Sequence, residues 1–136
     1  MSGQRKVLVF GTFDGLHEGH LNFFKQAKEH GDYLVAVVGR DSTVERVKKK
    51  LPKYDQFERL LAVQKCGLVD YAKLGNEGVS VYEVLKQIKP DIICLGYDQF
   101  IFIDKLEDKI KEFGLDSQIV RLKPYKPEIY HSSLLK

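Results

Sequence analysis

The residues best suited to chemistry are two histidines, His17 and His20, in the segment Gly-Thr-Phe-Asp-Gly-Leu-His-Glu-Gly-His at positions 11–20. Residues three apart on a helix share a face, so both imidazoles can reach one phosphate group. The start of a helix adds N–H groups and a partial positive charge, which favour the same anion. Gly19 removes a Cβ that would crowd a nucleotide. This spacing favours a binding site for a phosphate group.

Two other interpretations compete with this one. A zinc site is disfavoured, because the histidines lack the i, i+4 spacing of a zinc-binding helix. Neither His30 nor His131 supplies a third ligand by its spacing. A pair of surface histidines beside an ordinary tight turn would need no ligand at all. On the residues alone, that structural interpretation stays open.

Apolar runs and helical patterns predict the elements that position these residues. The runs that predict strands cover residues 7–10, 33–38, 69–74, 92–95 and 118–122. The patterns between them predict helices around Leu21, Phe24 and Ala27, from Asp41 or Ser42 to about 47, from about 57 to about 65, from Ser80 to Pro90, and over 106–113. Strands that alternate with helices predict a doubly wound, Rossmann-like α/β sheet of about five parallel strands. We expect a single domain over residues 1–136.

The predicted sheet also says where a ligand should bind. In open parallel sheets, ligands bind beyond the carboxyl ends of the strands, where the strand order reverses. Candidate segments should therefore follow Phe10, Val38, Leu95 and Leu122. The segment with the two histidines begins directly after Phe10.

Composition limits the class of protein. The chain has 136 residues, of which 43% are hydrophobic and 30% charged, with a net charge of +3. No apolar run reaches the ~20 residues that cross a bilayer, so we expect a cytoplasmic protein with no membrane partner. The basic residues form no stripe interleaved with aromatic side chains, so we expect no nucleic-acid partner. Cys66 and Cys94 are too few for a disulfide framework.

The segment 11–20 resembles the signature of the cytidylyltransferase-like nucleotidyltransferases, in which a Gly-Thr-Phe-Asp turn follows a strand and leads to a His-x-Gly-His pair. The resemblance implies an enzyme that transfers a nucleoside monophosphate from a nucleoside triphosphate to a phosphorylated acceptor and releases pyrophosphate. His17 and His20 would then be catalytic, stabilising charge on the phosphate oxygens. The residues expected to bind the nucleotide are Gly11, Thr12, Phe13, Asp14 and Gly19.

Other segments extend the resemblance over nearly the whole chain. Ser132 and Ser133 match a family element that binds the β- and γ-phosphates, and Lys48 is a further catalytic candidate. The expected acceptor- or phosphate-binding residues are Lys50, Arg59, Asp98, Gln99 and Arg121. A lysine run is usually only a solvated surface, which is the alternative for the cluster at 48–50. Mg²⁺ is expected as the cofactor, held by the triphosphate and possibly by Asp14.

Two subgroups of the family fit the chain. The archaeal-type FAD synthetases, which adenylylate FMN, resemble it in Gly-Tyr-Asp-Gln at 96–99 and His-Ser-Ser at 131–133. The glycerol-3-phosphate cytidylyltransferases share the turn, the histidine pair and the lysine spacing. Aromatic residues beside the expected pocket favour FMN with ATP over glycerol phosphate with CTP: Tyr97, Phe100, Phe102 and Tyr125. A non-catalytic nucleotide-binding module is the alternative outside enzymes, and we expect a homodimer.

Overall fold

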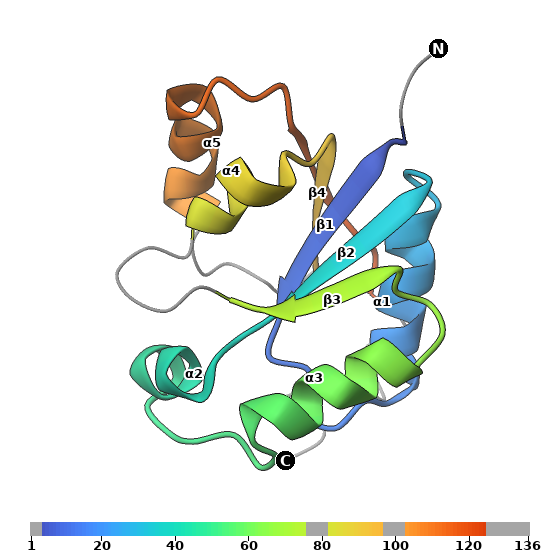
Figure 1. The fold of residues 1–136 in the computed structure, drawn as a ribbon, viewed down its shortest axis with the longest axis vertical. Coiled ribbons are helices and arrows are strands. Elements are labelled where there is room, and N and C mark those ends of the chain that lie inside the picture. Colours follow the sequence, from blue (N-terminus) through green and yellow to red (C-terminus); the bar gives the residue numbers. More distant parts are fainter. Residues whose placement is uncertain (1–3, 76–81, 97–102, 125–136) are drawn as a thin grey trace.

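The computed structural model describes residues 4–75, 82–96 and 103–124. Its strands form one parallel sheet in the order β3-β2-β1-β4-β5 (Figure 1). The strands are β1 (Lys6–Gly11), β2 (Tyr33–Val38), β3 (Tyr71–Leu74), β4 (Ile92–Leu95) and β5 (Gln118–Arg121). The helices are α1 (Glu18–Lys28), α2 (Asp41–Lys48), α3 (Gln56–Lys65), α4 (Glu83–Ile88) and α5 (Ile103–Glu112). The expected doubly wound sheet is confirmed.

The central strand β1 shows why these runs form buried strands. Successive residues of a strand point to opposite faces of the sheet. Val7, Leu8 and Val9 are nevertheless all fully buried, so both faces must be covered. This is the pattern of a parallel sheet inside an α/β protein. The chain order reverses at β1, which pairs with β2 on one side and β4 on the other.

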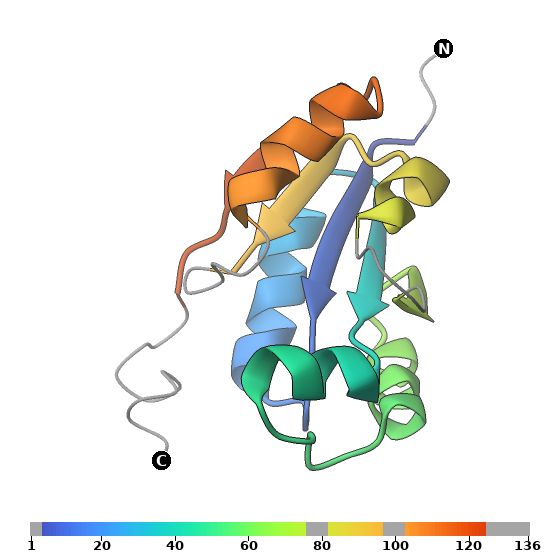
Figure 2. The ribbon, with the colours of Figure 1, turned by 90° about the vertical axis from the view of Figure 1, so that its left-hand side faces the viewer.

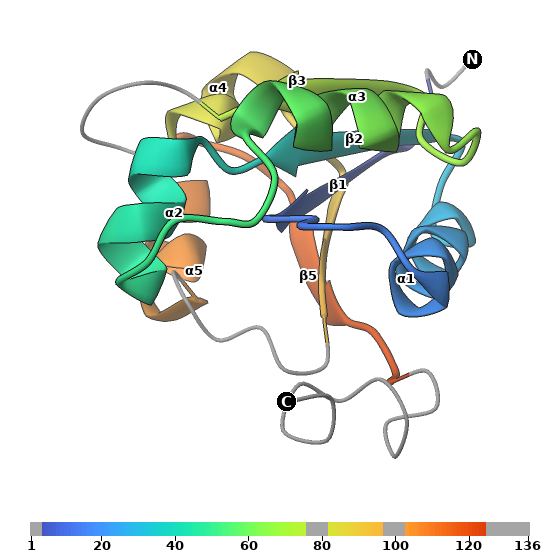
Figure 3. The same cartoon turned by 90° about the horizontal axis from the view of Figure 1, so that it is seen from below.

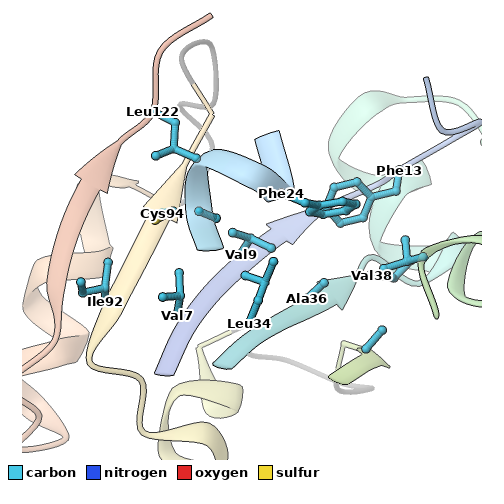
Figure 4. Packing of buried hydrophobic residues seen from close by; sticks show 13 residues of the cluster. Val7, Val9, Phe13, Phe24, Leu34, Ala36, Val38, Ile92, Cys94 and Leu122 are labelled. Atoms are coloured by element: carbon cyan, nitrogen blue, oxygen red, sulfur yellow. The ribbon is translucent and has the colours of Figure 1, made fainter. Parts of the chain in front are cut away.

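Different helices cover the two faces. Figure 3 shows α1 and α5 on opposite sides of β1. One core cluster joins Val7 and Val9 to Phe24 of α1 and Val63 of α3 (Figure 4). The other cluster packs the opposite face against buried residues of α4 and α5: Leu8, Val35, Val37, Val84, Leu85, Ile93, Leu95, Leu106 and Ile110.

Unlike these helices, α2 does not lie over a face of the sheet. Figure 2 shows it beyond the arrowheads of β1 and β2, at the carboxyl edge of the sheet. The expectation that Asp41 or Ser42 caps this helix is wrong. The N-cap residue is Arg40, whose side chain makes no capping hydrogen bond. The Asp41 carboxylate instead bonds to Gln56 and Arg59 of α3.

Three aspartates tie the strands together at the opposite, amino edge. Each directly precedes a strand, and its carboxylate accepts a backbone N–H at the start of the neighbouring strand. Asp70 accepts from Leu34 N at 2.8 Å. Asp91 accepts from Lys6 N at 2.8 Å, and Asp32 accepts from Arg5 N, just before β1, at 3.1 Å. These bonds fix the starts of parallel strands that the chain connects only through long crossovers.

Two further expectations concern where β3 and α4 begin. Strand β3 begins at Tyr71, two residues later than the apolar run predicts. Asp70, just before it, bonds to Leu34 of β2 through both its N–H and its carboxylate. Ser80, the expected start of α4, lies outside the described residues. Within the described part of the chain, no helix has both the length and the apolar character to cross a membrane.

Candidate functional site

The turn that follows β1 has a conformation that only certain residues adopt easily. Phe13 and Gly15 both have positive φ angles, of 53° and 81°. The ring of Phe13 folds back over Gly11, where an added Cβ would lie 2.5 Å from the Phe13 Cζ atom. Glycine at position 11 is therefore required by the packing of Phe13, independently of any ligand.

The two histidines begin α1 and bond to its backbone. His17 is the N-cap residue, and its Nδ1 accepts from Gly19 N at 2.9 Å. His20 Nδ1 accepts from His17 N at 3.3 Å. The rings are stacked, with centroids 4.0 Å apart and an interplanar angle of 28°. This arrangement brings the two imidazoles together at the carboxyl edge of the sheet, as the sequence predicts.

These hydrogen bonds also determine the tautomer of each histidine. A neutral imidazole has one N–H donor and one acceptor nitrogen. Because Nδ1 is the acceptor in both His17 and His20, the proton of the neutral ring is on Nε2. The pair therefore supplies two Nε2–H donors at the start of a helix, which is the chemistry that an anionic phosphate requires.

Phe13 lies behind the histidines. Its side chain is only 4% exposed, and its ring meets His20 edge-on, with 5.7 Å between centroids. On its other side it packs against Phe24, at 5.1 Å (Figure 4). The sequence predicts that Phe13 binds the nucleotide, but the structure places its side chain in the core, where it supports His20. A contact through the backbone of this turn stays a prediction.

Asp14 faces the α2–α3 connection. One carboxylate oxygen accepts from Lys53 N at 2.7 Å, and the other accepts from Tyr54 N at 2.9 Å. The ring of Tyr54 also lies against Gly15, where a Cβ would come within 3.3 Å of it. Asp14 therefore joins two loops, whereas the sequence suggested a contact with the nucleotide or its metal.

Arg59 is placed inside the molecule rather than on a phosphate-binding surface. Its relative exposure is 1%, and it is the one charged side chain that is buried among the described residues. It donates to the carbonyl oxygens of Tyr54, Thr12 and Gly39 at 2.8–2.9 Å, and to the Asp41 carboxylate at 2.7 Å. Its expected role in binding the acceptor is not what this geometry favours, because the guanidinium already bonds to four protein oxygens.

The lysine cluster lies at the end of α2 and in the connection that follows. Lys48 is the last residue of α2, and Lys49 ends the helix in a left-handed conformation with φ 66°. Lys49, Lys50 and Lys53 are exposed. Because Lys53 N bonds to Asp14, this part of the connection lies directly beside the turn that leads to the histidines.

On the other half of the carboxyl edge, Arg121 ends β5 beside the end of β4. Its guanidinium donates to Gly96 O at 2.7 Å, so it links the ends of these two strands. The other residues expected on this side lie outside the described residues: Tyr97, Asp98, Gln99, Phe100, Phe102, Tyr125, Ser132 and Ser133.

A protein-held metal finds no support in the described residues. No group of three or more His, Cys, Asp and Glu side chains is arranged there to hold a metal ion. Both oxygens of Asp14 accept backbone N–H groups, so this carboxylate has a structural role, and the predicted contact of Asp14 with magnesium stays a prediction. A magnesium ion would have to come with the triphosphate itself.

Sequence reasoning missed the partners of Arg59 and Asp14. Asp41 was expected to be a helix cap, and Gln56 and Tyr54 were not singled out. Asp41 N donates to Gln56 Oε1 at 2.9 Å, and Gln56 N donates back to Asp41 Oδ2 at 3.2 Å. No spacing rule links residues 41 and 56, because these bonds depend on how two separate helices meet.

The family model described as cytidylyltransferase-like matches residues 8–135. The FAD synthase of Thermoplasma volcanium is 41% identical over 131 residues, which are 96% of this chain and 91% of that protein. The FAD synthase of Methanosarcina acetivorans is 44% identical over 117 residues, which are 86% of this chain and 76% of that protein.

Solved structures were compared as well. A crystal structure of a protein described as the lipopolysaccharide core biosynthesis protein of Thermoplasma volcanium superposes with a TM-score of 0.83 and 42% identity. It covers 91% of this chain and 100% of that one. Pantothenate synthetase of Thermus thermophilus gives a TM-score of 0.57 at 18% identity, over 86% of this chain and 55% of its own. At that identity, the likeness is evidence for the fold alone.

Proposed function

Because the chain belongs to the cytidylyltransferase-like family, we propose that it is an FAD synthase, which transfers AMP from ATP to FMN. For transfer of a nucleotide, the main support is the stacked pair of His17 and His20, both with Nδ1 bonded to backbone N–H groups. For flavin as the acceptor, the support is the 41% identity to an FAD synthase over 96% of the chain.

The proposed reaction is an in-line displacement at the α-phosphorus of ATP. A phosphate oxygen of FMN forms a new bond to that phosphorus, and the bond from phosphorus to the bridging oxygen breaks. The electron pair leaves with pyrophosphate. Such a transfer needs stabilisation of negative charge more than it needs a protein nucleophile. The Nε2–H groups of His17 and His20 would donate to phosphate oxygens as this charge develops.

The other site residues take roles within this proposal. Lys48 would stabilise the triphosphate in the transition state, and Lys50 would bind a substrate phosphate. Exposed ammonium groups on a loop suit this task, because they attract phosphates and can still release pyrophosphate. We propose that the backbone of Gly11, Thr12 and Gly19 contacts the nucleotide. The proposed contacts outside this turn are Asp98, Gln99, Arg121, Ser132 and Ser133.

Magnesium enters the proposal only as part of the nucleotide substrate. The negative charge of ATP is ordinarily screened by Mg²⁺, which prefers phosphate oxygens, water and one or two carboxylates. We propose that Asp14 is not one of those carboxylates and that it instead holds the backbone at Lys53 and Tyr54, which bond to both of its oxygens.

One experiment tests the function and its main alternative together. Purified protein with Mg²⁺ is given ATP and FMN, or CTP and glycerol 3-phosphate, and both pyrophosphate and the nucleotide product are measured. We expect FAD to form faster than CDP-glycerol. A CTP-dependent rate without FMN turnover would contradict the flavin assignment. Nucleotide binding without pyrophosphate release from either pair would instead support a non-catalytic binding module.

The assembly and location are also proposals. We propose a cytoplasmic homodimer, as the sequence analysis expects. Light scattering on the purified protein would then give twice the mass of one chain at micromolar concentration. A mass of one chain across that range would contradict the dimer, and the enzymatic assignment would be unaffected.

A further inference from the structure

We propose that Arg59 and Asp14 are positioning residues that hold the lysine-bearing connection, residues 49–55, against the 12–15 turn beside the histidines. In this proposal neither side chain binds a substrate phosphate or magnesium. The proposal rests on the proposed function for its kinetic consequences. Its structural part, that these two side chains hold the connection in place, can be tested without any catalysis.

The connection is tied to the turn at three points. The Asp14 carboxylate accepts the N–H groups of Lys53 and Tyr54 at 2.7 and 2.9 Å. Arg59 reaches both segments, because it donates to Tyr54 O and to Thr12 O. The Tyr54 ring closes over Gly15. Together these contacts place the backbone at Lys53 next to the residues that lead to His17.

Arg59 also connects this assembly to the sheet. It donates to Gly39 O, just after β2, and to the carboxylate of Asp41 at the start of α2. Asp41 and Gln56 exchange hydrogen bonds, which joins the first residues of α2 and α3. The guanidinium therefore lies where the end of β1, the end of β2 and the starts of two helices meet.

The burial of Arg59 argues against a direct role on a phosphate. A buried charge is tolerated only when it is paired and fully hydrogen-bonded. Among the described residues, no buried side-chain nitrogen or oxygen lacks a partner. To bind a phosphate, Arg59 would have to leave carbonyl oxygens that come from three different loops. Those oxygens, in partly buried positions, would then lose their donor, which is costly.

The consequence concerns the lysines. Ammonium groups on exposed loops are spread over many conformations, and ordering them reduces binding. A connection that is already fixed at Lys53 and Tyr54 presents Lys50 over a narrower range of positions. Asp14 and Arg59 would in this way act on the substrate through the lysines, without touching it.

The first test uses limited trypsin digestion, since trypsin cleaves after lysine. Asp14→Asn keeps the size of the side chain but turns one oxygen into an N–H₂ group, which cannot accept from the backbone. We expect cleavage after Lys49, Lys50 or Lys53 to be about tenfold faster than in wild type, as for the loss of a hydrogen bond to a charged group.

The matched control is Asp32→Asn, because the Asp32 carboxylate also accepts a backbone N–H, but at the amino edge of the sheet. Cleavage within residues 49–53 should be unchanged in that variant. Equal cleavage rates in wild type and Asp14→Asn would overturn the proposal. The result does not depend on whether the protein makes FAD.

The second test separates positioning from metal binding. At ATP and FMN concentrations below KM, Asp14→Asn should lower activity while the Mg²⁺ concentration for half-maximal rate stays within about twofold of wild type. Even the loss of a residue that only supports a metal ligand typically changes metal affinity or activity about 10- to 100-fold. A shift of that size in the Mg²⁺ dependence would overturn the proposal for Asp14.

The third test concerns Arg59. Arg59→Lys keeps the positive charge, but one ammonium group cannot reach all four acceptors. We expect faster cleavage within 49–53 together with lower kcat/KM. If Arg59→Lys retained wild-type kinetics and cleavage, the positioning role would be wrong. If that variant does not fold, Asp14→Asn still tests the connection.

A double-mutant cycle tests whether Asp14 acts through Lys50. Lys50→Ala should raise KM in wild type, and it should raise KM less in the Asp14→Asn background, because the lysine is no longer held in place. Residues that act through one another give such non-additive effects. Strictly additive effects of the two substitutions would overturn the proposed link between Asp14 and the lysines.

Discussion

The two edges of the sheet use the same kind of bond for different purposes. At the amino edge, Asp32, Asp70 and Asp91 accept backbone N–H groups from neighbouring strands. At the carboxyl edge, Asp14 also accepts backbone N–H groups, but from a loop that carries lysines. The first set fixes strands that must pair, whereas the second fixes a loop beside the turn that leads to the histidines.

This difference suggests that similar substitutions should have different effects at the two edges. A carboxylate at the amino edge stabilises the fold and lies far along the strands from the histidines. A carboxylate at the carboxyl edge adds little to the sheet, but it determines where functional side chains lie. Loss at the amino edge should therefore appear in stability, and loss at the carboxyl edge should appear in activity.

The largest effect is expected at the histidines. His17→Ala or His20→Ala should lower kcat for FAD formation by about 100- to 1,000-fold, as for the loss of a donor to a developing charge. Nucleotide affinity should change much less. Because His17 also caps α1, its loss should cost about 1 kcal/mol of stability. Steady-state kinetics and urea unfolding measure the two effects.

The matched control is His30→Ala. His30 follows the carboxyl end of α1, whereas His17 and His20 lie at its amino end. Its turnover should equal that of wild type. Wild-type turnover in either His17→Ala or His20→Ala would contradict the catalytic assignment of that histidine and weaken the contrast between the two edges.

The next effect is expected at the lysines. Replacing both Lys48 and Lys50 with alanine should weaken nucleotide or acceptor binding about 2- to 30-fold, since exposed charge contacts are each worth roughly 0.2–1 kcal/mol. The loss should shrink as salt rises, because such contacts are screened. Titration calorimetry at low and high salt measures this. A double Lys25→Ala and Lys111→Ala variant, at exposed positions on α1 and α5, controls for net charge.

The difference between the two edges can also be tested by a substitution at the amino edge. Asp91→Asn should lower the free energy of unfolding by about 1 kcal/mol, because its carboxylate accepts Lys6 N where β4 meets β1. Turnover should be unchanged. Urea unfolding and the FAD assay on the same preparation measure both. A fall in turnover without loss of stability would mean that the two edges are not functionally separate.

The smallest effect is expected in the interior between the edges. Cys94 on β4 is fully buried, and burial raises the pKa of its thiol to about 12. The thiolate is the reactive form, so a maleimide at pH 7 should label the half-buried Cys66 first and Cys94 only on unfolding. Mass spectrometry of the labelled peptides measures this. Rapid labelling of Cys94 in the native protein would contradict its burial.

The same pKa predicts how stability depends on pH. The pKa of an ordinary cysteine is ~8.5. Above that pH, Cys94 in the unfolded chain loses a proton that it keeps in the folded protein. The contribution of Cys94 to stability is therefore complete below ~8.5, and it is lost as the pH rises toward the folded value.

Much of the fold could be predicted because its strands are continuous apolar runs. The runs at 33–38 and 92–95 give the bounds of β2 and β4 to the residue. The start of α3 was harder to place, because its cap, Asp55, and the reciprocal Glu58 lie in a polar stretch. The place of the histidines also followed from sequence, since parallel strands bring their carboxyl ends to one edge.

The roles of Arg59 and Asp14 could not be predicted in the same way. An arginine on an amphipathic helix normally faces solvent, and nothing local marks Arg59 as buried. Its acceptors are mostly backbone carbonyl oxygens, which every residue has and which therefore leave no signal in the sequence. Asp14 likewise bonds to backbone N–H groups 39 and 40 residues away. Such contacts become visible only when the loops are placed in space.

The position of β1 in the middle of the sheet has a consequence for the order in which the chain folds. Contacts between β1 and the start of β2 span 27 residues, and contacts between β1 and the start of β4 span 85. Closing the longer loop costs about 1 kcal/mol more in chain entropy, so the first β-α-β unit should form before β4 joins it. Pulse-labelled hydrogen exchange during refolding would then protect β2 amides ahead of those in β4. During synthesis on a ribosome, β1, α1 and β2, which place the histidines, would form before β4 and β5, at the other half of the carboxyl edge, have been synthesised.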